Sequence, residues 1–318
     1  MQGVWLQDQS LSFRTDLPEP SVDHGAALVQ VCVAGICNTD LEVLRGYRPL
    51  MGVLGHEFVG RVVSAGDLQG RRVVSEINLR PPGCACPACV RGDLTHCHNR
   101  RVLGMTDRNG AFAERLAVPR ENLYAVPDSV TDDEAVFVEP LAAACEILEQ
   151  IEIMPRDRVA VVGPGKLGLL CGQVLALTGC ALTLFGRRPG ALELARCLGL
   201  EARDVGEADA RFDVVVDCTG SPDGFQFARN LLRPRGTFVL KSTYVGELTV
   251  DMSRIVVDEI RLVGSRCGPF PKALQLLADK AVQVTPLIDA RYPLSQGLDA
   301  LDHAARPGAN KILLDIAA

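Results

Sequence analysis

The stretch Val159-Ala160-Val161-Val162-Gly163-Pro164-Gly165-Lys166-Leu167-Gly168 decides the fold class of this chain. An apolar run with strand character enters a turn with three glycines, and apolar residues then recur at helical spacing up to residue 177. A glycine-rich turn that follows a strand and opens a helix is the context that a dinucleotide-binding fingerprint requires. The stretch therefore predicts a cofactor-binding domain in which strands and helices alternate.

Each glycine of this turn has its own physical role. Gly163 allows the tight turn, Gly165 lets the backbone approach a pyrophosphate, and Gly168 permits close packing of helix on strand. Backbone N–H groups at the start of the helix, at Lys166 and Leu167, then bind the anion together with the helix dipole. We therefore expect the pyrophosphate of a dinucleotide to lie on residues 163–168.

The position that distinguishes NAD from NADP follows about twenty residues later. Proteins that bind NAD carry an acid there for the ribose 2′-hydroxyl, whereas this sequence reads Phe185-Gly186-Arg187-Arg188. Without a carboxylate there is no repulsion toward a 2′-phosphate, and two guanidinium groups supply bidentate, charge-assisted partners for it. This favours NADP over NAD. The alternative is that both arginines form a solvated strand end and that NAD binds without its usual acid.

The alternation of strands and helices continues beyond the turn. Segments at 159–162, 181–185 and 214–216 have strand character, helical patterns at 166–177 and 189–198 separate them, and further pairs follow to about residue 285. Val214-Val215-Val216 is a continuous apolar run, as expected of a strand that is covered on both faces. We therefore expect an α/β domain with a doubly wound parallel sheet.

The first 127 residues have a different pattern, with short β-branched runs at 27–33, 58–64, 72–75 and 112–118 between glycine and proline turns. This pattern predicts an all-β barrel or sandwich with a short helix at 38–44. Thr131 and Glu134 then form a capping box, and Pro140 at the first position of the next helix places Glu139 at that helix's mouth. The last thirty or so residues look like a return to the β-rich region, which periodicity alone does not decide.

Twelve cysteines in a long chain without a signal peptide indicate metal binding or catalysis rather than disulfides. Cys84, Cys86, Cys89 and Cys97 form the pattern C-x-C-x2-C-x7-C in a loop rich in proline and glycine. Such a set is typical of a closed tetrahedral zinc site that stabilises a loop, and four free thiols are the alternative. Seven others lie in apolar segments and are interpreted as small buried hydrophobes: Cys32, Cys145, Cys171, Cys180, Cys197, Cys218 and Cys267.

A second group of metal-binding residue types is spread along the chain. His56 and Glu57 are adjacent in Leu54-Gly55-His56-Glu57, whereas Cys37 and Glu139 lie far from them. Sulfur, nitrogen and oxygen ligands from Cys37, His56 and Glu139 would leave one position open, which a catalytic zinc needs. Glu57 is then either an extra ligand or an acid behind the ligands. A buried thiol at Cys37 and an ordinary helix-terminal acid at Glu139 are the alternatives.

The composition limits the partners. Of the 318 residues 47% are hydrophobic, enough for two globular domains with full cores. A net charge of −6 without a basic block argues against nucleic acid and anionic membranes as partners. There is no apolar run long enough to span a bilayer and no signal-peptide pattern, so the sequence predicts a cytoplasmic protein.

Several motifs occur in the order in which one known family has them: Gly35-Ile36-Cys37-Asn38-Thr39-Asp40, Gly55-His56-Glu57, the four-cysteine loop, Gly110-Ala111-Phe112-Ala113-Glu114, Val138-Glu139-Pro140-Leu141 and the loop at 163–168. Over nearly its whole length the chain resembles the zinc-dependent medium-chain dehydrogenases, in particular the sorbitol, threonine and glucose dehydrogenase branch. It departs from their pattern at Asn38, at Glu42, where many members have a histidine, and in a first cysteine gap that is one residue shorter.

The resemblance implies a GroES-like catalytic domain, residues 1–153 and 286–318, around an inserted Rossmann domain, residues 154–285, with the active site in the cleft between them. It makes Cys37, His56 and Glu139 the catalytic zinc ligands, with Glu57 adjacent and exchanging with water. A homodimer or homotetramer is implied as well.

The resemblance also implies roles for two threonines. Thr39 falls where the family has a hydroxyl that passes the alcohol proton toward solvent. Thr219, in Asp217-Cys218-Thr219-Gly220, lies in the segment that lines the nicotinamide side.

These inferences lead to one functional hypothesis and two rivals. The hypothesis is a zinc-dependent oxidoreductase that transfers a hydride between an alcohol or polyol, or the corresponding carbonyl, and a nicotinamide cofactor. The rivals are a zinc-free quinone or enoyl reductase on the same fold and a non-catalytic dinucleotide-binding redox sensor. Arg45, Tyr47 and Arg48 hint at a polar or anionic substrate or are simply solvated, so the sequence does not identify the alcohol.

Overall fold

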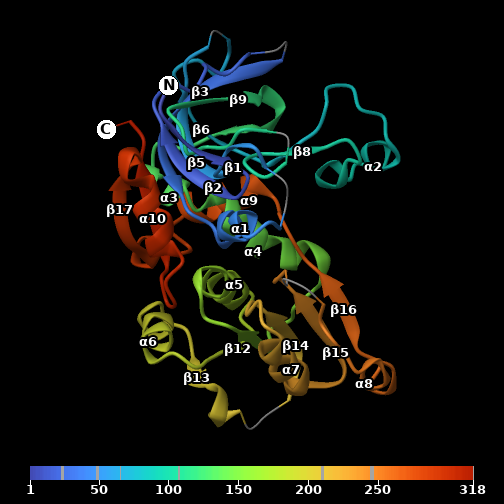
Figure 1. The fold of residues 1–318 in the computed structure, drawn as a ribbon. Coiled ribbons are helices and arrows are strands. Elements are labelled where there is room, and N and C mark those ends of the chain that lie inside the picture. The colour runs from blue at the N-terminus through green and yellow to red at the C-terminus, as the bar shows by residue number, and fades with distance from the viewer. Residues whose placement is uncertain are drawn as a thin grey trace. The chain divides into compact units, whose positions relative to one another are not determined.

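The structure of the protein, a computed structural model, describes residues 1–22, 25–47, 50–64, 66–106, 108–208, 211–243 and 247–317. Arg48, one of the residues considered for substrate binding, lies outside these ranges. The chain divides into two units (Figure 1). Unit 1 comprises Met1–Glu139, Ala273–Asp279 and Leu287–Ala318, and unit 2 comprises Pro140–Lys272 and Lys280–Pro286.

Unit 1 is dominated by β-strands, as its short β-branched runs predict. Its strands are β1 (Gly3–Gln7), β2 (Ser10–Arg14), β3 (Ala26–Gly35), β4 (Gly52–Val53), β5 (Glu57–Val62), β6 (Arg72–Ser75), β7 (Asn78–Leu79), β8 (Arg101–Val102), β9 (Arg115–Pro119), β10 (Leu123–Ala125), β17 (Ile288–Pro293) and β18 (Lys311–Asp315). Its helices are α1 (Asn38–Leu44), α2 (Pro87–Val90), α3 (Asp132–Ala135) and α10 (Gly297–Ala304). Two further helices, α4 (Val138–Gln150) and α9 (Phe270–Ala278), contribute residues to both units.

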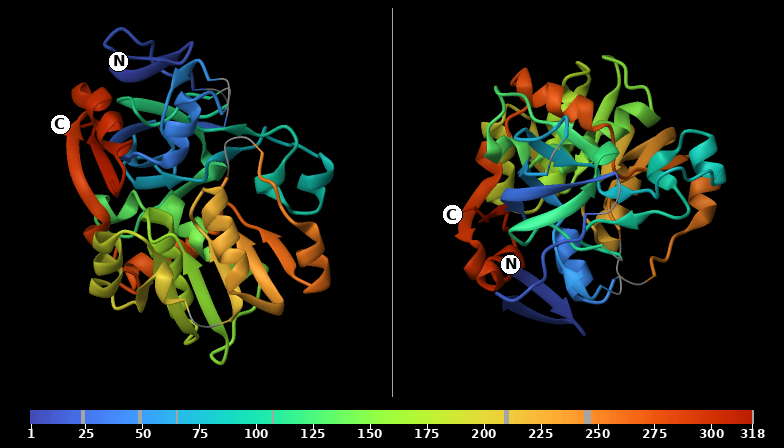
Figure 2. Two further views of the ribbon diagram at one scale, coloured as in Figure 1. Left: turned by 60° about the horizontal axis from the view of Figure 1, so that its bottom comes forward. Right: turned by 90° about the horizontal axis from the view of Figure 1, so that it is seen from above.

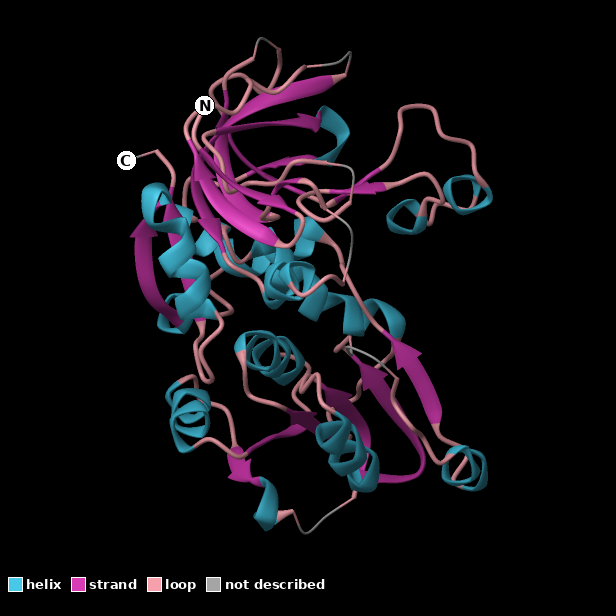
Figure 3. Ribbon diagram, in the orientation of Figure 1, coloured by secondary structure: helices cyan, strands magenta, loops and turns pink. Residues whose placement is uncertain are grey.

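The largest sheet of unit 1 brings the two ends of the chain together. Its strand order is β10-β6-β5-β3-β18-β17, with β9 also paired to β3. Figure 3 draws the strands in magenta and marks the two chain ends. On one side of β3, Gly35 lies opposite Glu57 of β5, and on the other side Gly35 lies opposite Leu313 of β18. The C-terminal residues therefore do return to the β-rich region, which the sequence suggested without deciding.

The helix starts of unit 1 follow from capping. The predicted capping box is present, because Thr131 Oγ1 accepts the Glu134 N–H at 3.3 Å and Glu134 Oε2 accepts the Thr131 N–H at 2.8 Å. The prediction for the next helix was wrong by two residues, since α4 begins at Val138 and Pro140 is its third residue. The first four N–H groups of a helix have no partner within it, so a proline is tolerated there. Glu139 therefore lies within the first turn of α4.

Unit 2 contains the predicted doubly wound parallel sheet, with the strand order β13-β12-β11-β14-β15-β16. The strands are β11 (Arg158–Val162), β12 (Ala181–Gly186), β13 (Ala202–Asp204), β14 (Phe212–Asp217), β15 (Leu232–Leu240) and β16 (Arg261–Gly264). The helices are α5 (Lys166–Ala176), α6 (Pro189–Cys197), α7 (Pro222–Leu231) and α8 (Met252–Val257). Strands β14 to β16 lie side by side in Figure 1 and in the left view of Figure 2.

The burial of side chains agrees with a sheet that is covered on both faces, and it shows which of the cysteines predicted to be buried are not. The β-branched residues of β11 and β14 are almost completely buried, as expected of strands that are covered on both faces, and Phe185 and Phe238 fill the core beside them. Cys145 and Cys171 are buried as predicted, but the prediction for Cys197 was wrong, because this last residue of α6 is exposed. The other four predicted hydrophobes, Cys32, Cys180, Cys218 and Cys267, are half-buried. Among the described residues, no helix is long and apolar enough to cross a membrane.

Candidate metal centres and cofactor loop

Cys37 is the residue that caps α1, where a serine or threonine is usual. Its Sγ accepts the Thr39 N–H at 3.4 Å and lies 3.6 Å from Thr39 Oγ1. Asp40 completes a capping box, because its Oδ2 accepts the Cys37 N–H at 2.9 Å. The thiol is thereby fixed between the end of β3 and the start of α1, beside the hydroxyl that the sequence predicts as a proton carrier.

His56 and Glu57 are positioned by the glycine that precedes them. Gly55 has a φ of +98°, which L side chains rarely adopt, and a Cβ there would lie 2.4 Å from the Phe112 ring. His56 directly precedes β5 and Glu57 is its first residue, and the two are 2% and 1% exposed. The structure brings them to Cys37, since one ligand atom of each of the three residues lies within 4.8 Å of the others.

The Asp40 carboxylate lies beside the Nδ1 atom of the His56 imidazole. Its Oδ1 lies 3.2 Å from His56 Nδ1, and both side chains are buried. Burial alone lowers the pKa of His56, but the Asp40 carboxylate and the Cys37 thiol outweigh it, and the pKa is raised well above its usual value. A carboxylate on one ring nitrogen leaves the other for a metal ion, which then competes with the proton. Asp40 was not among the predicted site residues, although its position three residues after Cys37 was an available signal.

Glu139 is near this cluster without belonging to it. It is not in the group of ligand atoms that lie within 4.8 Å of one another among the described residues. Burial raises its pKa to about 7; the charges of His56 and Lys311 lower it and that of Glu57 raises it. The structure therefore brings together Cys37, His56 and Glu57 and places Glu139 within electrostatic reach of them.

The donor set fits a zinc ion. Sulfur, imidazole nitrogen and carboxylate oxygen are the ligands that zinc takes in catalytic sites. Glu57 Oε1 is buried and has no hydrogen-bond partner among the described residues, and an orphaned carboxylate oxygen next to a thiol and an imidazole is readily satisfied by a cation. Cys37, His56 and one or both of Glu57 and Glu139 would hold the ion.

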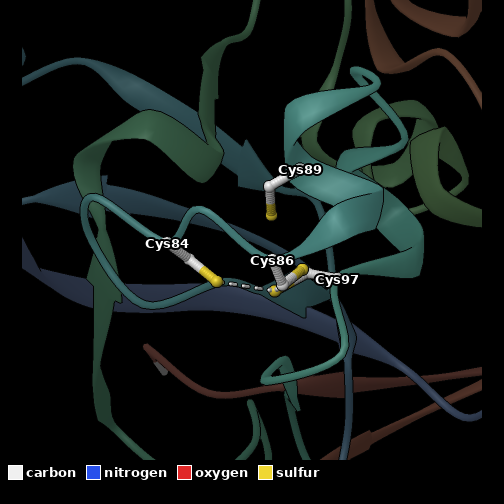
Figure 4. Close-up of side chains that lie close together, drawn as sticks. All are labelled: Cys84, Cys86, Cys89 and Cys97. Carbon is white, nitrogen blue, oxygen red and sulfur yellow. Dashed lines mark hydrogen bonds between the residues drawn. The ribbon is translucent and has the colours of Figure 1, made fainter.

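The four loop cysteines form a second cluster, shown in Figure 4. Cys84 and Cys86 come from the loop after β7, Cys89 from α2 and Cys97 from the residue after a short 3-10 helix, Leu94–His96. Cys97 Sγ lies 3.6 Å from Cys84 Sγ and 3.9 Å from Cys86 Sγ. Four sulfurs at about 2.3 Å from a tetrahedral zinc are about 3.8 Å apart, so the cluster has the dimensions of such a site.

The backbone around these thiols favours thiolates. N–H groups of Cys89 and His98 lower the pKa of Cys86 to about 6, whereas burial and the neighbouring sulfurs raise the pKa of Cys89 to about 12. Asn99 also donates to Cys84 Sγ at 3.5 Å. Neighbouring thiolates at these distances repel one another, and a bound divalent cation offsets this repulsion. The cluster fits a structural zinc better than four independent thiols.

The glycine turn of unit 2 has the predicted strand–turn–helix geometry. Gly163 has a φ of +94°, Gly165 is the N-cap of α5 without a side-chain cap, and Lys166 and Leu167 form its first turn. A Cβ on Gly168 would lie 2.0 Å from Gly163 O, so helix and turn pack too closely for any side chain. Uncapped N–H groups at the start of an 11-residue helix are suited to a phosphate.

The residues predicted around the rest of the cofactor differ in their surroundings. Gly186 is buried against Pro164. Arg187 and Arg188 after it are exposed, and their guanidinium groups have no hydrogen bond or ion pair among the described residues. Thr219 is half-buried, and its hydroxyl donates to Asp217 Oδ1 at 2.7 Å. The two guanidinium groups are thus available to an anion, whereas the Thr219 side chain orders its own turn.

Two protein families match this chain, one mainly within unit 1 and the other mainly within unit 2. The alcohol dehydrogenase GroES-like domain family matches residues 23–128, and the zinc-binding dehydrogenase family matches residues 167–279. The chain belongs to the zinc-binding alcohol dehydrogenase family. This confirms the predicted combination of a GroES-like domain with a Rossmann-type sheet, and the protein is an oxidoreductase of the zinc-dependent alcohol dehydrogenase type.

Individual relatives cover almost the whole dehydrogenase chain. The sorbitol dehydrogenase of Halalkalibacterium halodurans is 31% identical over 93% of each chain, and the D-arabitol-phosphate dehydrogenase of Enterococcus avium is 28% identical over 99% of this chain and 97% of its own. Among solved structures, a protein from Sinorhizobium meliloti 1021 described as a zinc-binding dehydrogenase bound to NADP is 29% identical, with a TM-score of 0.90 over 99% of this chain and 98% of its own.

Proposed function

We propose that this dehydrogenase oxidises the hydroxyl of a polyol, or reduces the corresponding carbonyl, at the buried cluster of Cys37, His56 and Glu57 with Glu139 nearby. The observation that carries the proposal is the convergence of sulfur, nitrogen and oxygen donors within 4.8 Å of one another in unit 1. Zinc, when bound, supplies Lewis acidity toward an alcohol oxygen, and a nicotinamide ring supplies the hydride acceptor.

The residues of the chain have separate roles in this reaction. Cys37 and His56 hold the metal, and Asp40 orients the imidazole from a distance of 3.2 Å. Thr39 lies beside the Cys37 thiol, where its hydroxyl takes the proton that the alcohol loses and passes it toward solvent. With a nicotinamide cofactor bound, the carbinol carbon would give up its hydride, so that one proton and one hydride would leave each alcohol that becomes a carbonyl.

For the cofactor we favour NADP over NAD, bound along the turn at 163–168. The exposed Arg187 and Arg188 stand after Gly186 where a carboxylate would select NAD, and they support this preference. Thr219 belongs to the nicotinamide side of the same site. One similar structure, from Sinorhizobium meliloti 1021, contains NADP, and another, an alcohol dehydrogenase from E. coli CFT073, is complexed with NADH, so both cofactors occur among relatives.

The substrate class comes from the relatives. Sorbitol and D-arabitol phosphate are the alcohols in the names of two relatives that cover nine-tenths or more of this chain. A polyol or polyol phosphate is therefore the proposed substrate. A zinc-free reductase is disfavoured because it would need none of the three converging donors, and a redox sensor would not turn over any alcohol.

We also propose a domain division and an oligomer. Residues 1–153 and 286–318 form the catalytic domain and residues 154–285 the cofactor domain. A homodimer or homotetramer is supported by exposed apolar side chains on α8 and on the edge strand β16, namely Met252, Val256, Val257 and Leu262. We further propose that the enzyme is cytoplasmic.

The decisive experiment is a panel of polyols, polyol phosphates, sugars, hydroxy acids and simple alcohols, each assayed with NAD and with NADP by nicotinamide absorbance. We expect turnover of at least one polyol and its loss in Cys37→Ser and His56→Ala, with cofactor affinity unchanged in both variants. Near-normal turnover in either variant would refute the metal-dependent reaction. If no compound of the panel is turned over while zinc and cofactor are both bound, the result would favour the non-catalytic redox sensor.

A further inference from the structure

Two cysteines of unit 2 that have no part in the proposed reaction lie in sulfur–sulfur contact. Cys171 lies in the middle of α5, and Cys218 directly follows β14. The Cys218 thiol donates to Cys171 Sγ at 4.0 Å, a distance that leaves no room for another atom between the sulfurs. The S–S bond of a disulfide is about 2.05 Å long, so the two sulfurs would have to approach each other by about 2 Å to form one.

The two thiols differ as acids. The hydrogen bond from Cys218 lowers the pKa of Cys171, burial opposes this effect, and the charge of Lys241 lowers the pKa further. The same hydrogen bond raises the pKa of Cys218 well above its usual value, and burial adds to this. The pair therefore carries its thiolate on Cys171 and its remaining proton on Cys218. A thiolate reacts with peroxides, and a thiol directly beside it can then close a disulfide.

The cation near this pair is a buried lysine at the end of the neighbouring strand. Lys241 directly follows β15, is 9% exposed, and donates to Ala143 O at 2.6 Å and to Ser265 Oγ at 3.2 Å. Both acceptors are neutral, so neither offsets the charge of the ammonium group. The carboxyl group of Glu146 lies within electrostatic reach, but burial raises its pKa. Lys241 therefore supplies positive charge that stabilises the Cys171 thiolate.

Cys218 packs directly on the glycine turn that is proposed to bind the dinucleotide. Its N–H donates to Val162 O at 2.9 Å, and a Cβ added to Gly163 would lie 3.0 Å from Cys218 O. A Cβ on Gly168 would lie 3.5 Å from Cys218 Cβ. Since Cys171 belongs to the helix that this turn opens, a bond between the two sulfurs must shift Cys218 or the helix. Packing this close transmits such a shift to the turn.

We propose that Cys171 and Cys218 are an oxidative modification site, which hydrogen peroxide converts into a reversible disulfide that weakens dinucleotide binding. Cys171 is buried and Cys218 is half-buried, so the oxidant has to be small. Formation of the disulfide is independent of the proposed reaction, whereas its effect rests on the proposed cofactor turn at 163–168.

The modification consumes one peroxide for each pair of thiols. The Cys171 thiolate attacks a peroxide oxygen, the O–O bond breaks, and a sulfenic acid forms while hydroxide leaves. The Cys218 sulfur then attacks the sulfenic sulfur, the S–O bond breaks, and the hydroxyl group leaves with the Cys218 proton as water. The hydroxide takes up the proton that Cys171 had released, so two thiols and one hydrogen peroxide give one disulfide and two waters. Two electrons pass from the sulfurs to the peroxide, and dithiothreitol returns them.

The test treats the zinc-loaded enzyme with hydrogen peroxide, removes the peroxide and maps disulfides by mass spectrometry after alkylation of the free thiols. NADPH affinity is measured by fluorescence titration before peroxide, after peroxide and after dithiothreitol. We expect a peptide pair linked through Cys171 and Cys218, and a Kd for NADPH that rises by about tenfold or more and returns with dithiothreitol. Because coupling between two sites is reciprocal, saturating NADP should in return suppress the disulfide.

Three variants separate this site from general oxidation. Cys171→Ser should bind NADPH as the wild type does and keep that affinity after peroxide, and Cys171→Ala replaces it if the serine variant does not fold. Cys145→Ser is the matched control, because Cys145 is also buried in unit 2 but burial raises its pKa to about 12; the linked peptide should form there as in the wild type. Lys241→Gln keeps a hydrogen-bond donor toward Ala143 O but not the charge, so it should slow disulfide formation.

The linked peptide decides the modification, and the Kd decides its consequence. The inference is overturned if peroxide oxidises the exposed Cys197 without linking Cys171 to Cys218, or if the linked peptide forms without a change in the Kd for NADPH. It is also overturned if Cys171→Ser loses affinity after peroxide as the wild type does. If the untreated wild type binds neither NADPH nor NADH, the proposed cofactor site fails and the effect with it, whereas the linked peptide still decides whether the cysteines form a modification site.

Discussion

Replacement of both Arg187 and Arg188 by alanine should weaken NADP binding selectively. Both side chains follow β12 at the position where an acid would select NAD, both are exposed, and neither has a partner among the described residues. The only contact that their removal should abolish is therefore the one to a 2′-phosphate, which NAD lacks. Binding of NAD should be unchanged.

The magnitude follows from exposure. Hydrogen bonds to charged groups contribute about 1.5–3 kcal/mol, but solvent screening at an exposed site reduces each arginine to about 1 kcal/mol. Removal of both arginines should therefore weaken the binding free energy of NADP by about 2 kcal/mol, which is about a 30-fold increase in its Kd. Because the contact is ionic, the wild-type preference for NADP should also shrink as salt is raised, whereas the variant should show little salt dependence.

Isothermal titration with NADP and NAD at low and high ionic strength measures both effects. Arg254→Ala, at an exposed arginine on α8, is the matched control and should leave both affinities unchanged. An unchanged Kd for NADP would establish the solvated strand end as the correct interpretation. Equal weakening of NADP and NAD would show that the arginines support the fold of the site rather than read the phosphate.

Other predictions concern local geometry and metal. Gly168→Ala should abolish NADPH binding in a fluorescence titration, since the new Cβ would lie 2.0 Å from Gly163 O, and retained affinity would contradict the close packing of turn and helix. Cys89→Ser should remove one zinc equivalent per chain by elemental analysis and lower Tm, whereas unchanged zinc content would mean that the loop thiols are free. Thr131→Ala should lower the free energy of unfolding, measured in urea, by about 1 kcal/mol, because the capping box with Glu134 is lost. If the free energy of unfolding falls less than it does for an alanine substitution at an exposed control position, the cap does not stabilise the protein.

The features that the sequence predicted correctly are those that neighbouring residues determine. The turn at 163–168 and the Thr131 capping box each depend on contacts between residues a few positions apart. The four loop cysteines also lie within a short segment and do come together, whereas the zinc ion assigned to them stays a prediction. Local backbone geometry is specified by such short patterns, so a single sequence suffices to identify them.

What the sequence could not predict depends on contacts between distant segments. Glu57 and Lys311 are separated by 254 positions and meet only because β18 pairs with β3. The sequence also did not show that Glu139 would lie outside the group formed by Cys37, His56 and Glu57. The position of Glu139 depends on where the first turn of α4 lies, and the residue type does not reveal this. Non-local pairing is fixed by the whole core, which a linear pattern does not contain.

The candidate metal centre thus has an outer partner for each of the residues that converge. The Thr39 N–H donates to the Cys37 sulfur, Asp40 lies against His56, and Lys311 pairs with Glu57. Partners of this kind fix ligand orientation before the metal arrives, so less conformational freedom is lost on binding. Two of these partners come from α1, directly after the cysteine, but the third comes from the C-terminal strand. The metal centre therefore forms completely only when the last strand has joined the sheet, which couples the folding of the chain's end to its chemistry.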